Sequence, residues 1–177
     1  MKLFTVDLEG RSYTWNEQRW FDSRTYQAPP AVLASRLNEL LASHLEIEDS
    51  KVKDFKELLR IAQIAREASQ YKRAEKALRR AIQLEPSSEA AFAILCSVLR
   101  HLGASDRAVR ETEHLRSSSY SPLVVSRATA FCDLGQWEDA KKTLARALAM
   151  GGSPEAFEVV HRIKANRPDL YEKKGDR

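Results

Sequence analysis

The sequence predicts a mainly α-helical protein built of repeated antiparallel helix pairs, with a small β-hairpin at its N-terminal end. Three observations lead to this prediction. Apolar residues recur with helical spacing from about residue 30 onward. Capping and turn residues divide that region into short helices, and one helical pattern returns after intervals of 34 and 32 residues.

The hairpin is predicted from "LFTVDLEGRSYTW" at residues 3–15, where apolar and polar residues alternate around Glu9 and Gly10. A two-residue turn at this point pairs Leu8 with Arg11, Val6 with Tyr13, and Phe4 with Trp15. The apolar and aromatic members of these pairs then share one face, which must cover something because a lone hairpin is barely stable in water.

Two interpretations of this aromatic face stay open. In the first, the hairpin packs on the following helix and caps the N-terminal end of the repeat array. In the second, the aromatic arm, which continues through Trp20, Phe21 and Tyr26, forms a recognition or dimerisation surface. The first is favoured because aromatic side chains are more often buried than exposed.

Start and stop signals divide the remaining chain into helices. Ser121-Pro122 and Ser153-Pro154 combine a capping side chain with a proline in the first turn, while Gly103 and Gly135 stand where helices should end. We therefore expect helices at residues 30–46, 51–67, 70–84, 88–101, 105–117, 122–133, 137–149 and 154–165.

The repeated pattern is clearest where "GQWEDAKKTLARAL" at 135–148 aligns with "SQYKRAEKALRRAI" at 69–82. A looser copy lies at 103–115. The three copies place a small residue at the same point, namely Ala74, Ala108 and Ala140. Small residues at these points allow helices to approach closely, so Ala74→Leu should overpack a helix contact.

This pattern resembles the tetratricopeptide repeat family over about residues 55–152. The second copy departs from the family pattern at Thr112 and Tyr120, and the third departs at Arg127 and Gly152. The resemblance implies a short right-handed α-solenoid. It divides the chain into an N-terminal hairpin and aromatic arm (1–29), a helix and linker (30–50), three repeats (51–152), and a capping helix with a tail (153–177).

Composition is compatible with a globular protein of the reducing cytoplasm. Lys and Arg number 29 against 25 Asp and Glu, a net charge of +4 that does not by itself select nucleic acid. No apolar run is long enough for a membrane span, and the start "MKLFTVDLEG" has no secretory pattern. Cys96 and Cys132 lie in helical patterns, so we expect buried, reduced thiols.

No catalytic motif is recognisable. The four histidines lack metal-ligand spacing, and no glycine-rich phosphate loop or nucleophile elbow occurs. We therefore expect a non-enzymatic protein without a cofactor or metal, located in the cytoplasm.

The resemblance implies that the first helix of each pair lines a concave groove and offers its outward residues to a peptide of a partner protein. Helical spacing assigns the groove to Lys56, Leu59, Gln63, Arg66, Ala93, Ser97, Arg100, Val125 and Thr129. Arg66 and Arg100, one repeat apart, would suit a carboxylate or an acidic peptide, although ordinary exposed arginines near helix ends would look the same.

Chaperone-binding members of the family hold a C-terminal carboxylate with Lys, Asn and Arg side chains. This sequence has Leu59, Gln63, Ile94, Pro122 and Ser126 at the matching positions, so that activity is not expected.

Two alternative functions stay open. The basic stretch at 70–82 could contact nucleic acid, but its charges surround an apolar line and the nearby aromatic, Tyr71, lies on that line, so a solvated outer face is favoured. The aromatic arm could instead join two copies of the chain as a homodimer.

Overall fold

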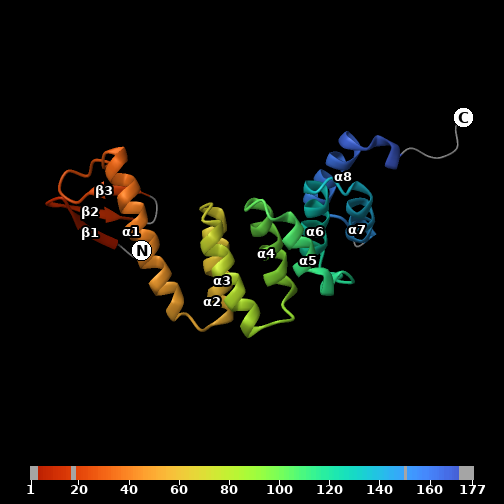
Figure 1. Cartoon of the computed structure of the whole chain (residues 1–177), viewed down its shortest axis with the longest axis horizontal. Coiled ribbons are helices and arrows are strands. Elements are labelled where there is room, and N and C mark those ends of the chain that lie inside the picture. The colour runs from red at the N-terminus through yellow and green to blue at the C-terminus, as the bar shows by residue number, and fades with distance from the viewer. Residues whose placement is uncertain (1–3, 17–18, 150, 172–177) are drawn as a thin grey trace, which may run out of the picture. The chain divides into compact units, whose positions relative to one another are not determined.

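The computed structural model describes residues 4–16, 19–149 and 151–171 (Figure 1). The chain divides into two compact units, the first ending at Val52 and the second beginning at Lys53. Across the described residues, no helix is both long and apolar enough to cross a membrane.

The first unit is an antiparallel sheet with a helix. Its strands follow one another in the sheet in chain order, and the elements are β1 (Phe4–Leu8), β2 (Arg11–Trp15), β3 (Trp20–Asp22) and α1 (Ala31–Lys51). The predicted hairpin register is confirmed, because β1 and β2 pair Phe4 with Trp15, Val6 with Tyr13, and Leu8 with Arg11.

The turn between β1 and β2 has positive φ at both central residues, 53° at Glu9 and 75° at Gly10. This is the backbone of a type I′ turn, whose twist matches that of the flanking strands. Glycine adopts it without steric cost, whereas Glu9 must accept a conformation that side chains disfavour.

The aromatic arm contributes a third strand that the sequence analysis did not predict. Trp20 pairs with Trp15 across β2 and β3, is 5% exposed, and donates its Nε1–H to Asn38 Oδ1 of α1 at 2.9 Å. Three-residue strands carry too little alternation to be recognised in a sequence. The hairpin's aromatic face therefore packs on α1 as expected, around a core of Tyr13, Trp20, Leu37 and Leu41. That this unit caps the repeat array stays a prediction.

The second unit is a row of short helices. They are α2 (Phe55–Glu67), α3 (Tyr71–Leu84), α4 (Glu89–His101), α5 (Ser105–Glu111), the 3₁₀ turn η1 (Glu113–Leu115), α6 (Ser121–Asp133), α7 (Trp137–Ala149), α8 (Pro154–Asn166) and the 3₁₀ turn η2 (Pro168–Leu170). Apart from α5, these bounds agree with the expected ranges to within four residues. The second expected helix, 51–67, begins instead at Phe55, because the Asp54 carboxylate caps it by accepting the Glu57 N–H at 2.8 Å.

Helices adjacent in the chain pack as pairs, α2 with α3, α4 with α5, and α6 with α7 (Figure 1). In addition, α2 contacts α4, α4 contacts α6, and α6 contacts α8. The first helices of the pairs and α8 thus form one continuous row. We call the solvent side of this row the first-helix face.

Each pair ends its first helix in the same way. Ser69, Gly103 and Gly135 have φ of 58°, 74° and 71°, and the residue after each donates its N–H to the carbonyl five positions back in a Schellman motif. For the third pair, this bond runs from Gln136 N–H to Phe131 O at 2.9 Å. The glycines expected to end helices therefore do so, and Ser69 takes that place in the first pair.

Small residues occupy the helix contacts, as predicted. Ala74 of α3, Ala108 of α5 and Ala140 of α7 are all fully buried. The first helices contribute equally buried small residues at Ala62, Cys96 and Ala128. Tyr71, at the start of α3, stacks on His101 at the end of α4, with ring centroids 4.7 Å apart.

The expected helix 105–117 is wrong at its C-terminal half, since α5 ends at Glu111 and η1 follows. Thr112 Oγ1 donates to Ala108 O at 2.7 Å, and Arg127 Nη1 of α6 donates to Thr112 Oγ1 at 2.6 Å and to Val109 O at 3.2 Å. If the helix continued, the Val109 carbonyl would accept a backbone N–H. It accepts a hydrogen bond from the Arg127 guanidinium instead.

Two of the four departures from the repeat pattern, Thr112 and Arg127, are therefore partners. Arg127 is 4% exposed, and its Nη2 donates to Glu113 Oε2 at 2.9 Å. At these two positions a polar group of one repeat meets a polar group of the next, so the seam between the second and third pairs is polar where an apolar contact was expected.

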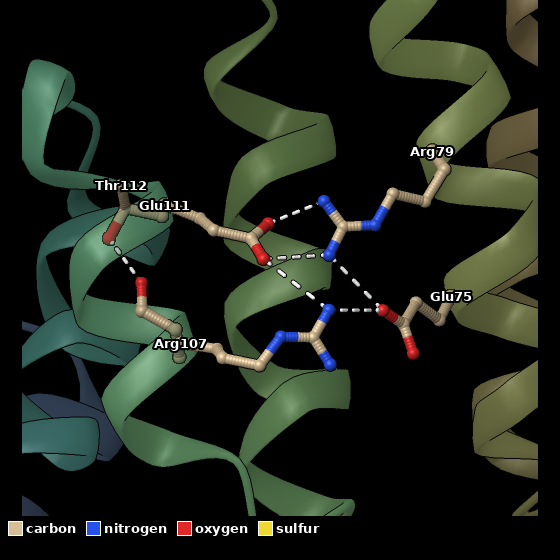
Figure 2. Close-up of polar contacts among 6 residues, drawn as sticks. Glu75, Arg79, Arg107, Glu111 and Thr112 are labelled. Atoms are coloured by element: carbon tan, nitrogen blue, oxygen red, sulfur yellow. Dashed lines mark hydrogen bonds and ion pairs between the residues drawn. The ribbon is translucent and has the colours of Figure 1, made fainter.

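A second polar network joins α3 to α5 on the opposite side from the first-helix face (Figure 2). Arg79 Nη1 donates to Glu111 Oε2 at 2.5 Å and its Nη2 to Glu111 Oε1 at 2.7 Å. Arg107 and Arg79 both donate to Glu75 Oε1, at 2.8 and 3.1 Å. Two arginines and two glutamates thus tie the first pair to the second.

Ala74→Leu should lower the free energy of unfolding by about 1–3 kcal/mol, because three additional carbons must fit where no space exists. Urea unfolding of the full chain measures the change. The matched control is Ala145→Leu on the exposed side of α7. Equal stability of the two variants would contradict the close helix approach at Ala74.

Thr112→Val should cost about 1–3 kcal/mol, because it removes the shortest hydrogen bond of the buried Arg127 guanidinium. In an Arg127→Leu background the same substitution should cost less than half as much, since no guanidinium is left without its acceptor. A double-mutant cycle by urea unfolding measures this coupling. Identical costs in both backgrounds would show that the two residues act independently.

Candidate functional site

The first-helix face contains a pocket of about 410 Å³ where α4, α6 and α8 meet. Its residues are Arg100 of α4, Val125, Ser126 and Thr129 of α6, and Glu155, Glu158, Val159 and Arg162 of α8. Val125 and Val159 are 8% and 5% exposed, so the pocket has an apolar floor. Polar and charged side chains surround that floor.

Three of the predicted groove residues, Arg100, Val125 and Thr129, come together in this pocket. Ser97 lies half-buried on α4, while Ala93 is 6% exposed and contributes little surface. The four predicted residues of α2 lie outside the pocket. Among them Lys56 and Gln63 are exposed, and Leu59 and Arg66 are half-buried.

Arg100 is already bound to a carboxylate of its own chain. Its Nε donates to Asp133 Oδ2 at 2.7 Å, and Arg162 Nη1 donates to the other oxygen, Oδ1, also at 2.7 Å. Ser105 Oγ donates to Oδ2 at 3.2 Å. Asp133, at the end of α6, therefore joins α4, the start of α5 and α8 in one network.

The electrostatics of this network keep Asp133 ionised at neutral pH. Burial raises the pKa of its carboxyl group, but the hydrogen bonds from Arg100 and Arg162 lower it by more, so the net pKa lies below the ordinary value. A carboxylate held by two guanidinium groups is not readily displaced by another carboxylate. Arg100 is therefore a structural partner of Asp133 in the free protein.

The sequence analysis did not assign Asp133, Glu155, Glu158 or Arg162 to the site. For the three residues of α8 a signal existed, because positions 155, 158 and 162 lie on one side of a helix. Helix α8 was interpreted as a cap only. For Asp133 no local signal existed, since its partners lie 33, 28 and 29 residues away.

A second pocket, of about 390 Å³, lies between the connection after η1 and helices α6 and α7. Its cations are largely engaged in structural bonds. Arg127 binds Glu113, and Arg146 donates to the backbone carbonyls of Arg116 and Ser118. The residues around this pocket therefore take part in the polar contacts between the second and third pairs.

The thiols are buried and free, as expected. Cys96 and Cys132 form no disulfide. Burial raises the pKa of Cys96 to about 12, so this thiol is protonated at neutral pH and is a poor nucleophile. Among the residues that the structure describes, no group of three or more His, Cys, Asp or Glu side chains could hold a metal ion.

The basic stretch at 70–82 lies on α3, with Ala74, Ala77, Leu78 and Ala81 turned into the core. Arg79 of this stretch is bound by Glu75 and Glu111 in the network of Figure 2. The positive charge of Arg79 is thereby neutralised by carboxylates of the same chain.

The repeated helix pairs, their shared helix ends and their small-residue contacts define this fold as a helix-pair repeat array, an α-solenoid. Comparison with family models gives a match to the tetratricopeptide repeat over residues 59–122. Residues 59–122 thus match the family that the sequence pattern resembles. A search of curated protein sequences returns no match.

Solved structures with a similar fold include two tetratricopeptide repeat domains. The domain of Arabidopsis OM64 superposes with a TM-score of 0.58 at 16% identity, covering 63% of this chain and 95% of that domain. The Sgt2 domain from Aspergillus fumigatus superposes with a TM-score of 0.61 at 16% identity, covering 71% of this chain and 89% of that one. At this identity the likeness concerns the fold.

Asp133→Asn should lower the free energy of unfolding at pH 7 by about 1 kcal/mol, because two charge-assisted hydrogen bonds become neutral ones. The folded-state pKa of Asp133 is lowered, so its stabilisation is present above the unfolded-state pKa, about 4, and is lost as the pH falls below it.

Urea unfolding of the parent and Asp133→Asn chains at pH 7 and at pH 3 measures this effect, with the exposed Asp139→Asn as control. The difference between parent and Asp133→Asn should shrink at pH 3. A difference that is the same at both pH values would contradict an ionised, hydrogen-bonded Asp133.

Proposed function

We propose that this protein is a non-enzymatic scaffold that binds a peptide segment of a partner protein along the first-helix face. Tetratricopeptide repeats are modules of protein–protein interaction, and the first helices line the peptide groove in arrays of this kind. The observation that carries the proposal is the pocket between α4, α6 and α8, because it brings predicted groove residues from two different repeats to one place.

The shape and chemistry of this face suit an extended segment. Ser97 and Ser126 offer hydroxyl groups along α4 and α6, and the valine methyl groups beneath them offer apolar contact. Thr129 offers an acceptor oxygen, because its hydroxyl donates to Val125 O at 2.8 Å. Toward α2, the exposed Lys56 and the half-buried Arg66 carry positive charge, so the sequence-based expectation of an acidic peptide applies at this end of the row. A cytoplasmic location is part of this proposal.

The alternative functions receive less support from the contacts described above. Nucleic-acid binding through α3 would have to use the cations other than Arg79, which is occupied by two glutamates. A homodimer through the aromatic arm would have to use what α1 leaves uncovered, since Tyr13 and Trp20 are in the core of the first unit. Of the arm's aromatics, Tyr26 is the most exposed, at 73%.

Ser126→Trp should weaken partner binding at least tenfold, because a large ring at a half-buried position of α6 fills the pocket while remaining compatible with a helix surface. The partner is first identified by incorporating a photo-crosslinking amino acid at Thr129 and analysing the crosslinked chains from the native cell. The affinity of the purified partner segment is then measured by calorimetry.

The matched control for this experiment is Lys142→Trp, on the exposed side of α7 away from the first-helix face. It should leave the affinity unchanged. Equal affinities of the two tryptophan variants would show that the partner binds elsewhere. Crosslinking to nucleic acid, or to a second copy of this chain through residues of the first unit, would support the alternative functions instead.

A further inference from the structure

The charges that line the pocket between α4, α6 and α8 differ in how they are satisfied. Arg100 and Arg162 share the carboxylate of Asp133. Glu155 and Glu158 are exposed on α8, and within the part of the chain that the structure describes neither has an ion-pair partner. The two arginines are each paired with a carboxylate, whereas among the described residues neither glutamate is paired with a cation.

The sequence of α8 would predict an ion pair at Glu158, which the described residues do not show. Arg162 follows it by four residues, which is the spacing and order that favour a pair along a helix. The structure instead commits Arg162 Nη1 to Asp133 Oδ1 at 2.7 Å, on a different helix. Glu158 thereby loses the cation that the sequence places beside it and faces the pocket uncompensated.

Glu155 and Glu158 also repel each other. They lie three residues apart on α8 and therefore on the same side of the helix, where like charges destabilise it. The hydroxyl of Ser153 and the backbone lower the pKa of Glu155, so it carries its charge at neutral pH. A cation bound between the two carboxylates would remove this repulsion.

The floor of the pocket restricts which cation fits. Val125 and Val159 offer methyl groups beside the glutamates. Lysine and arginine side chains combine an aliphatic stem with a charged end, so such a side chain can cover the valines and still reach a carboxylate at the rim. A small hydrated cation would leave the apolar floor in contact with water.

We propose that this pocket binds a lysine or arginine side chain of the partner peptide, with its stem over Val125 and Val159 and its charged end between Glu155 and Glu158. This inference rests on the proposed function and adds to it a chemical requirement on the partner. Together with Lys56 and Arg66 on α2, it gives the first-helix face opposite charges at its two ends. A bound peptide then has one preferred direction, with its basic residue toward α8.

The experiment is selection of a displayed library of random twelve-residue peptides against the full-length chain. The parent chain should enrich peptides with lysine or arginine at one position. The double variant Glu155→Gln/Glu158→Gln should lose that enrichment. The control, Glu138→Gln/Asp139→Asn on α7, removes the same charge from exposed residues outside the pocket and should retain it.

One enriched peptide is then synthesised with its basic residue and with norleucine in its place, and both affinities are measured by calorimetry. The replacement should weaken binding to the parent about tenfold, and to the glutamine variant less than twofold. Thermal melts of all three chains confirm that each is folded.

The outcomes separate this inference from the proposed function. Enriched peptides that crosslink to Thr129 but show no preference for lysine or arginine would overturn the inference and leave the proposed function standing. A preference that persists in the glutamine variant would also overturn it. If no peptide is enriched by any of the three chains, both the inference and the proposed function fail.

Discussion

The close approach of helices at alanine positions is the constraint on which the rest of the repeat unit depends. A fully buried Ala74, Ala108 or Ala140 leaves no side chain to hold two backbones apart, so the second helix of each pair settles against the first. Repetition of this contact sets α2, α4, α6 and α8 side by side. The pocket exists because this row brings α6 and α8 together at a fixed spacing.

Polar contacts between successive pairs act on top of this packing. Arg79 reaches Glu111, Arg100 reaches Asp133, and Arg127 reaches Thr112, each across a seam that separates one pair from the next. Charge-assisted hydrogen bonds depend on direction, whereas apolar contacts do not, so these bonds restrict how one pair can rotate against its neighbour. On the first-helix face, the same bonds decide which charges remain available to a ligand.

Most of the fold could be predicted from the sequence, because local signals mark it. Prolines, glycines and helical spacing placed most helix bounds, although α1 runs to Lys51 and not to the expected residue 46, and alternation around Glu9 and Gly10 placed the hairpin register. The site could be predicted only in part. Arg100, Val125 and Thr129, which helical spacing assigns to one surface, line one pocket, but no local pattern shows that the Asp133 carboxylate already binds Arg100. The end of α5 was missed for the same reason, since it depends on Arg127, a residue distant in the chain whose guanidinium donates to the Val109 carbonyl.

The exchange between Thr112 and Arg127 has a consequence for how this array can change. In a uniform solenoid any unit can be duplicated, deleted or moved, because every boundary is chemically alike. Here the third unit brings a buried guanidinium that only a preceding unit with a hydroxyl at Thr112 and an open carbonyl at Val109 can accommodate. The second and third units therefore form a matched couple, and exchanging either one for a different unit would leave the guanidinium or its acceptors without partners.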